Sequence, residues 1–171
     1  FSAQVNEIAG FSENNEIIFS AMLGFQLTAL RGQLEGQGLD SLAYAGTDAL
    51  DATGIQFEDN NEGIVHTPHV SIAAGDRNDT MLAGYAAAKG EELESRGFMP
   101  LYVDSMFLGI QAMLDCGCDD PAMIGDAVAA ISGFEGLSGT ITYAGTNGIP
   151  PKAVPVNQIV DGVDTLVATI G

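Results

Sequence analysis

Two short apolar runs, and the helix-like segment between them, constrain the fold of this chain more than any other feature. Residues 16–20 (EIIFS) and 41–45 (SLAYA) each have the length and composition of a buried strand. Between them, apolar residues recur at helical spacing over residues 23–37, and Gly38 follows where a left-handed residue commonly ends a helix. Strand, helix and strand in about 30 residues match a βαβ unit, which requires a parallel sheet with helices on its faces. The predicted fold class is therefore α/β.

The rest of the chain predicts further helices and strands. Pro68 interrupts one strand, because proline cannot donate to a ladder. Asp79 or Thr80 can cap one helix, and Asp120 followed by Pro121 is a typical cap and first turn of another. The predicted elements are a helix over residues 1–9, a strand over 62–71, helices over 79–93, 101–114 and 121–131, and strands over 153–160 and 165–170 around an Asp161-Gly162 turn.

Charge excludes one large class of function. The chain has 5 basic and 23 acidic residues, for a net charge of −18 at pH 7, so nucleic-acid phosphates would repel it. Hydrophobic residues make up 46% and charged residues 16% of the 171-residue chain, so the acidity does not indicate disorder. No apolar run approaches the ~20 residues that span a bilayer. We therefore expect a folded protein with no nucleic-acid partner.

The sequence predicts no catalytic residue and no cofactor. The segment 136–139 (GLSG) lacks the second glycine of a nucleophile elbow, because Thr140 stands at that position. The glycines after residue 35 end a helix, whereas a dinucleotide fingerprint would open one. An enzyme is therefore not the expected function.

A metal site is not predicted either. His66, His69, Cys116 and Cys118 provide the residue types of a Cys2His2 zinc site. However, the two cysteines have only one residue between them, which is tighter than the usual zinc spacing, and Pro68 bends the histidine segment.

Asp48 is the strongest candidate for ligand binding. It follows a predicted parallel strand directly, and open α/β sheets bind ligands beyond the carboxyl ends of their strands. Ser20, Ala21, Met22 and Leu23 hold the equivalent place after the preceding strand, where a helix begins and offers backbone donors. Thr47 would help to shape the same wall. An aspartate there suits a ligand with an ammonium group, although Asp48 could instead cap a short helix.

Several segments occur in an order that is typical of one family. EIIFSAM, LRGQLEGQGL, LAYAGTDAL, EGIVHTPHV and PLYVDSMFLGIQAML are followed by Phe134-x-Gly136-x-x-Gly139-x-Ile141, the Asn147-Gly148 turn and a closing segment over 159–162. Together they resemble the C-terminal half of type I periplasmic solute-binding proteins of the branched-chain amino acid class. The similarity covers nearly the whole chain.

The resemblance implies two Rossmann-like lobes with parallel sheets, here incomplete, and a ligand cleft between them. Residues 1–63 would be the remainder of the second lobe, 64–150 part of the first lobe after a hinge crossing, and 151–171 return strands to the second lobe. Such a half leaves apolar faces and strand edges uncovered, so we expect the missing N-terminal half of the same protein as a partner.

The resemblance also implies roles for individual residues. In the family, an acidic residue at or next to the position of Asp48 pairs with the ligand's amine. An aromatic residue often occupies the loop that here reads Ala-Met-Leu, and this departure suits a more apolar or differently shaped ligand. Thr67 and His69 match the second crossing, so we expect them in the hinge, with Thr67 facing the cleft.

The expected function is a periplasmic or extracellular solute-binding protein of an ABC importer, which takes an amino acid or a related small molecule. Its partners would be that ligand and the transporter's membrane subunits, and the complete protein would be a monomer. The alternative is a ligand-sensing receptor domain of the same fold, coupled to a signalling partner.

Overall fold

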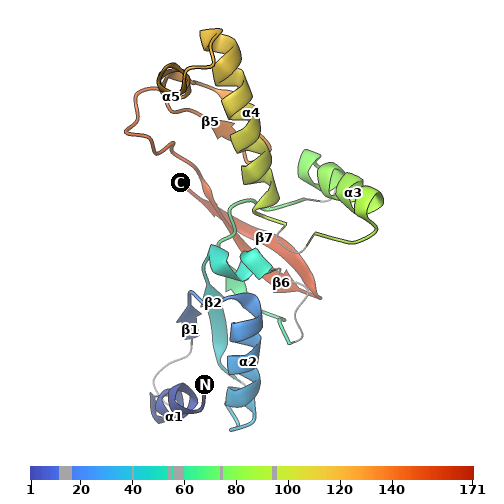
Figure 1. The fold of residues 1–171 in the computed structure, drawn as a ribbon. Coiled ribbons are helices and arrows are strands. Elements are labelled where there is room, and N and C mark those ends of the chain that lie inside the picture. The colour runs from blue at the N-terminus through green and yellow to red at the C-terminus, as the bar shows by residue number, and fades with distance from the viewer. Residues whose placement is uncertain (12–16, 40, 54, 56–59, 74, 94–95) are drawn as a thin grey trace. The chain divides into compact units, whose positions relative to one another are not determined.

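The chain folds into two compact units in the computed structural model, which describes residues 1–11, 17–39, 41–53, 55, 60–73, 75–93 and 96–171. The first unit comprises Phe1–Gly97 and Val154–Ile170, and the second comprises Phe98–Ala153 with Gly171 (Figure 1). The predicted lobe boundaries at residues 63 and 150 refer to a complete two-lobe protein and stay predictions. Among the described residues, no helix combines the length and apolar character needed to cross a membrane.

The first unit contains a five-stranded sheet in the order β1-β2-β3-β6-β7. The first three strands are parallel, and β6 and β7 form an antiparallel hairpin that pairs with β3. The α/β class predicted from the sequence is therefore confirmed. The strands are β1 (Ile17–Ser20), β2 (Ala43–Gly46), β3 (Val65–His66), β6 (Val154–Val160) and β7 (Val163–Ile170).

Helix α2 (Gly24–Glu35) connects β1 to β2, as the sequence predicts. Its leucines at positions 27, 30 and 34 lie on one face and are buried, and Gly38 adopts φ 80° just beyond the helix. The remaining helices of this unit are α1 (Ser2–Phe11), the 3-10 helix η1 (Asp48–Thr53) and α3 (Arg77–Lys89). The core around α2 comprises Val5, Leu27, Leu30, Leu34, Leu42, Tyr44, Leu50, Ile55, Ile64 and Ile159.

The second unit consists of two helices and a small hairpin. These are α4 (Met99–Cys116), α5 (Pro121–Ala130), β4 (Phe134–Glu135) and β5 (Thr140–Ile141). Asp120 caps α5 as predicted, because its Oδ1 accepts bonds from the backbone N–H groups of Ala122 and Met123 at 3.0 and 3.1 Å. Buried Asp104 of α4 holds the hairpin loop, since its carboxylate accepts from the N–H groups of Leu137 and Ser138 at 2.6 and 2.7 Å.

Several predicted boundaries are wrong, for identifiable reasons. Helix α3 begins at Arg77 because Asp76, and not Asp79 or Thr80, is its cap and accepts from Asp79 N at 2.7 Å. The strand expected over 62–71 shrinks to Val65–His66, shortly before Pro68. Helix α1 ends at Phe11 instead of residue 9, α3 ends at Lys89 instead of residue 93, and α4 spans Met99–Cys116 instead of 101–114. Strand β2 begins at Ala43 instead of residue 41, and Glu16, which was expected in the first strand, lies outside the described residues.

Candidate functional site

The carboxyl ends of the three parallel strands meet at one edge of the sheet. Ser20, the last residue of β1, is in register with Gly46 of β2, and Gly46 is in register with His66 of β3. The loops that follow these residues therefore emerge side by side. Every ligand-binding and hinge residue predicted from the sequence lies at this strand-end edge or in its loops, in residues 20–23, 47–48 and 67–69.

The loop after β1 is shaped by two hydrogen bonds that lead directly into α2. Ser20 Oγ accepts from Met22 N at 2.9 Å, and Gln26 Oε1 accepts from Leu23 N at 3.0 Å. Ala21 is exposed, whereas Met22 and Leu23 are half-buried. This wall of the edge is thus mainly apolar.

The loop after β2 is packed closely against its neighbours. A Cβ on Gly46 would lie 2.8 Å from Leu50 Cγ and 2.9 Å from the carbonyl oxygen of Ser20, so only glycine fits without a shift. Thr47 Oγ1 accepts from Ala49 N at 3.3 Å at the start of η1. Thr47 therefore takes the capping role that the sequence left open for Asp48, and the carboxylate of Asp48 points to another partner.

That partner is His69. Its Nε2 lies 3.0 Å from Asp48 Oδ2, and the two side chains are 37% and 45% exposed. The structure thus brings His69, which was predicted to lie in the hinge, into contact with Asp48, which was predicted to pair with a ligand's ammonium group. The sequence pattern did not indicate this pair, because the two residues follow different strands and meet only through the parallel register of β2 and β3.

A buried cluster that the sequence did not indicate lies in the same unit. His66 is fully buried, and its Nε2 lies 3.0 Å from Asp164 Oδ1 on β7. Asp51 of η1 is also buried, and its Oδ2 has no hydrogen-bond partner in the described part of the chain. Burial raises the pKa of Asp51 to about 6, although the nearby charge of His66 opposes this shift. Both residues belong to elements that carry the edge, since His66 ends β3 and Asp51 lies in η1.

Comparison with solved structures decides the fold. A leucine-binding protein LivK from Thermotoga maritima matches with a TM-score of 0.80 at 23% identity, over 99% of this chain and 48% of that one. An R. palustris ABC-transporter solute-binding protein in complex with benzoate matches with a TM-score of 0.76 at 15% identity, over 99% and 46%. A type 1 periplasmic binding protein from Bordetella pertussis matches with a TM-score of 0.76 at 16% identity, over 98% and 49%.

The chain has the type I periplasmic binding protein fold. It spans about half the length of the solved structures it matches, as a C-terminal half would. No protein-family model and no curated protein sequence matches the chain. At these identities the likeness establishes the periplasmic binding protein fold, and the ligand has to be argued from the residues.

In this periplasmic binding protein fold, the cysteines considered for a metal site are joined to each other. Cys116 and Cys118 form a disulfide across Gly117, which ends α4 in a left-handed conformation with φ 61°. Within the described residues, no group of three or more His, Cys, Asp or Glu side chains is placed to hold a metal ion. The histidines are instead engaged with aspartates at the strand-end edge.

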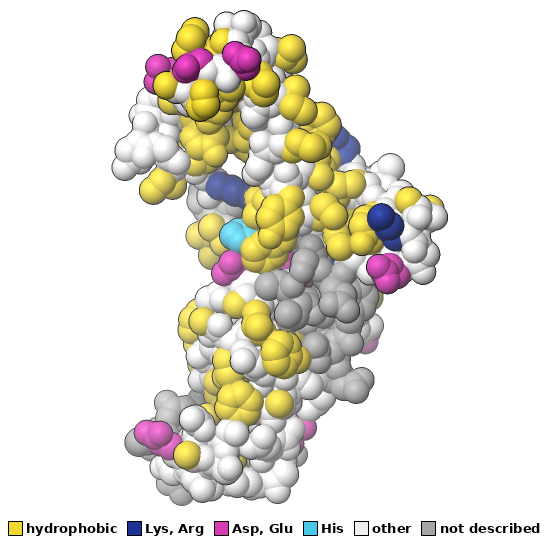
Figure 2. All heavy atoms as spheres, viewed as in Figure 1, with side chains coloured by type: hydrophobic (Ala, Val, Ile, Leu, Met, Phe, Trp, Pro, Cys, Tyr) yellow, Lys and Arg dark blue, Asp and Glu magenta, His cyan; other side chains and the backbone are white. Residues whose placement is uncertain are grey.

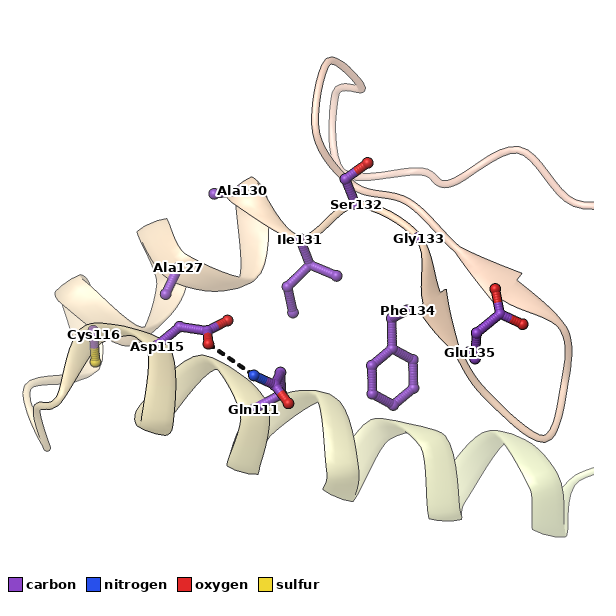
Figure 3. Close-up of a pocket in the computed structure, with 10 residues that line it drawn as sticks. All are labelled: Gln111, Asp115, Cys116, Ala127, Ala130, Ile131, Ser132, Gly133, Phe134 and Glu135. Atoms are coloured by element: carbon purple, nitrogen blue, oxygen red, sulfur yellow. Dashed lines mark hydrogen bonds between the residues drawn. The ribbon is translucent and has the colours of Figure 1, made fainter.

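The second unit has a surface cavity of about 710 Å³ between α4, α5 and β4 (Figure 3). In the close-up, Gln111 and Asp115 lie on α4 and face each other, with Gln111 Nε2 donating to Asp115 Oδ1 at 2.7 Å. Ile131 and Phe134 supply the apolar part of the lining. None of the predicted site residues lines this cavity.

Proposed function

We propose that this chain is part of an extracytoplasmic solute-binding protein of an ABC importer, which binds a small organic ligand in an interlobe cleft. The fold supports this proposal. The matching solved structures support it as well, because they include a leucine-binding protein and a solute-binding protein in complex with benzoate. The observation that carries it is the alignment of Ser20, Gly46 and His66 at one edge, with loops that present small, polar and apolar side chains.

Within this proposal, each loop has a role in contacting the ligand. Ser20, Ala21, Met22 and Leu23 form one wall, and Thr47 with Asp48 forms the next. Thr67 and His69 belong to the crossing that acts as a hinge. No bond of the ligand is made or broken, and affinity comes from contacts that form only when the lobes close.

The proposed complete protein contains the two lobes expected from the sequence. Residues 1–63 and 151–171 belong to the second lobe and 64–150 to the first. Large apolar side chains are exposed in both units, among them Phe19 at 70% and Leu114 at 71%, and Figure 2 shows hydrophobic side chains spread over the visible face of α4. Such exposure favours a covering partner, and we propose the N-terminal half of the same protein. The complete protein would act as a periplasmic or extracellular monomer.

A ligand-sensing receptor domain is the second candidate, because sensors and carriers share this fold. The two differ in what the closed form contacts. Stimulation of ATP hydrolysis by the complete ABC transporter in liposomes, on addition of the ligand-bound protein, would support the carrier. A signalling domain in the same polypeptide would support the sensor.

Binding can be tested by calorimetry on the full-length protein with a panel of amino acids and small organic acids. We expect Asp48→Ala to weaken binding at least tenfold, because a ligand that covers the edge would leave His69 without its carboxylate. Glu7→Gln removes an exposed carboxylate on α1 and serves as the matched control. Equal affinity of Asp48→Ala and the control would refute the role of Asp48.

A further inference from the structure

The exposed carboxylate at the strand-end edge already has a partner within the protein itself. Asp48, the acidic residue that the loops of this edge expose, has His69 Nε2 at 3.0 Å. The chain contains two histidines among 23 acidic residues, and both lie at this edge, each against an aspartate. An ammonium group that approached Asp48 would have to displace the imidazole or lie beside it, and like charges repel when the imidazole is protonated.

Among the residues that the structure describes, the other acidic groups near this edge do not provide an alternative partner for an ammonium. Asp164 is bound to His66, and Asp51 is buried beneath the loop. The residues that complete this surface, Met22 and Leu23, are apolar and half-buried. A cation at this edge would therefore lose water without gaining a carboxylate of its own.

The hydroxyl groups at the edge can donate a hydrogen bond to a ligand oxygen. Ser20 Oγ accepts from Met22 N at 2.9 Å, and Thr47 Oγ1 accepts from Ala49 N at 3.3 Å. Each hydroxyl accepts this one bond with one of its two lone pairs and keeps its hydrogen as a donor. A neutral carbonyl or hydroxyl oxygen can accept such a bond, whereas an ammonium group has only donors to offer.

We propose that His69 determines specificity by occupying Asp48, so that the ligand presents a neutral oxygen or an apolar group to this edge. The substrate class is then a small apolar organic acid without an amino group, such as a 2-oxo acid. This inference rests on the proposed function, because it assumes that a small organic ligand binds at the strand-end edge.

Calorimetry on the full-length protein with two matched pairs of probes tests the proposal. Leucine is compared with 4-methyl-2-oxopentanoate, and phenylalanine with phenylpyruvate; within each pair a carbonyl oxygen replaces the ammonium group. We expect at least tenfold tighter binding of the 2-oxo acid. The measured quantity is the ratio of the affinity for the 2-oxo acid to the affinity for the amino acid. We expect His69→Gln to lower this ratio at least tenfold and Asp48→Asn to raise it. Lys89→Gln, which removes an exposed cation on α3, should leave the ratio unchanged.

The ratio separates specificity from stability, since a variant that merely perturbs the fold weakens both members of a pair alike. An unchanged ratio in His69→Gln, with folding verified by circular dichroism, would overturn the inference. Tighter binding of the amino acid to the unmodified protein would also overturn it, while the proposed function would stand. Failure of both members of both pairs to bind would overturn the ligand class inferred here, whereas binding of another compound from the calorimetric panel would leave the proposed function standing.

Discussion

Asp51 is a carboxyl group in an environment that disfavours its charge. Burial raises its pKa to about 6; His66, the backbone of Gly97 and Arg96 lower it, and Asp164 raises it further. Because this pKa lies above the ordinary value of 3.8, the folded protein holds a proton that the unfolded chain releases at intermediate pH. The stabilising contribution of Asp51 is therefore complete below about pH 4 and is lost as the pH rises through 6.

This sign leads to a prediction for Asp51→Asn. The difference between a pKa of about 6 and the ordinary value of 3.8, at ~1.4 kcal/mol per pH unit, corresponds to ~3 kcal/mol of stability. We expect the free energy of unfolding of Asp51→Asn, relative to the unmodified protein, to increase by about that amount from pH 4 to pH 7. Urea unfolding at both pH values measures it. Glu7→Gln should show a much smaller change, and a pH-independent difference for Asp51→Asn would contradict the assignment.

Among the elements, the junction of β2 and η1 is sensitive to added volume. An alanine Cβ at position 46 would overlap Leu50 and the carbonyl oxygen of Ser20, and that oxygen belongs to the neighbouring strand. We expect Gly46→Ala to cost ~1–3 kcal/mol of stability and to weaken ligand binding, because η1 must shift. Gly32→Ala in α2 meets no atom within 4 Å and should stabilise by up to ~1 kcal/mol. Urea unfolding of both variants checks the contrast, which fails if the two changes have the same sign.

Elements with strong local signals were predictable from the sequence. The leucine spacing of α2, the Asp120-Pro121 start of α5 and the Asp161-Gly162 turn between β6 and β7 each depend on neighbouring residues alone. The placement of the residues after β1, β2 and β3 at one edge was also predictable, because strand ends in a parallel sheet share an edge, and their role in binding stays a prediction.

Features that depend on register or on distant residues were not predictable. The length of β3 is set by its partners β2 and β6, which lie far away in the sequence. The contact between Asp48 and His69, and the pairing of His66 with Asp164, likewise require the sheet to be assembled. Local propensity contains no information about either.

For the whole molecule, the excess of acidic residues predicts a dependence on salt. The net charge is −18, and repulsion between carboxylates destabilises the compact state. Raising NaCl from 0.1 to 1 M shortens the screening length from ~10 to ~3 Å, so we expect the thermal midpoint at pH 7 to rise by several degrees. Near the calculated pI of about 4.1 the same addition should have little effect. Equal shifts at both pH values would point to a cause other than charge.

Strand β3 is only two residues long, and this short length has a mechanical consequence. Only Val65 and His66 of β3 pair in register with both β2 and β6, and Glu62, Gly63 and Ile64 add a few hydrogen bonds to the hairpin. The β6–β7 hairpin, in contrast, is paired from Val154 to Ile170. A pulling force across the sheet would consequently separate it first along β3, leaving the hairpin intact as a detached flap.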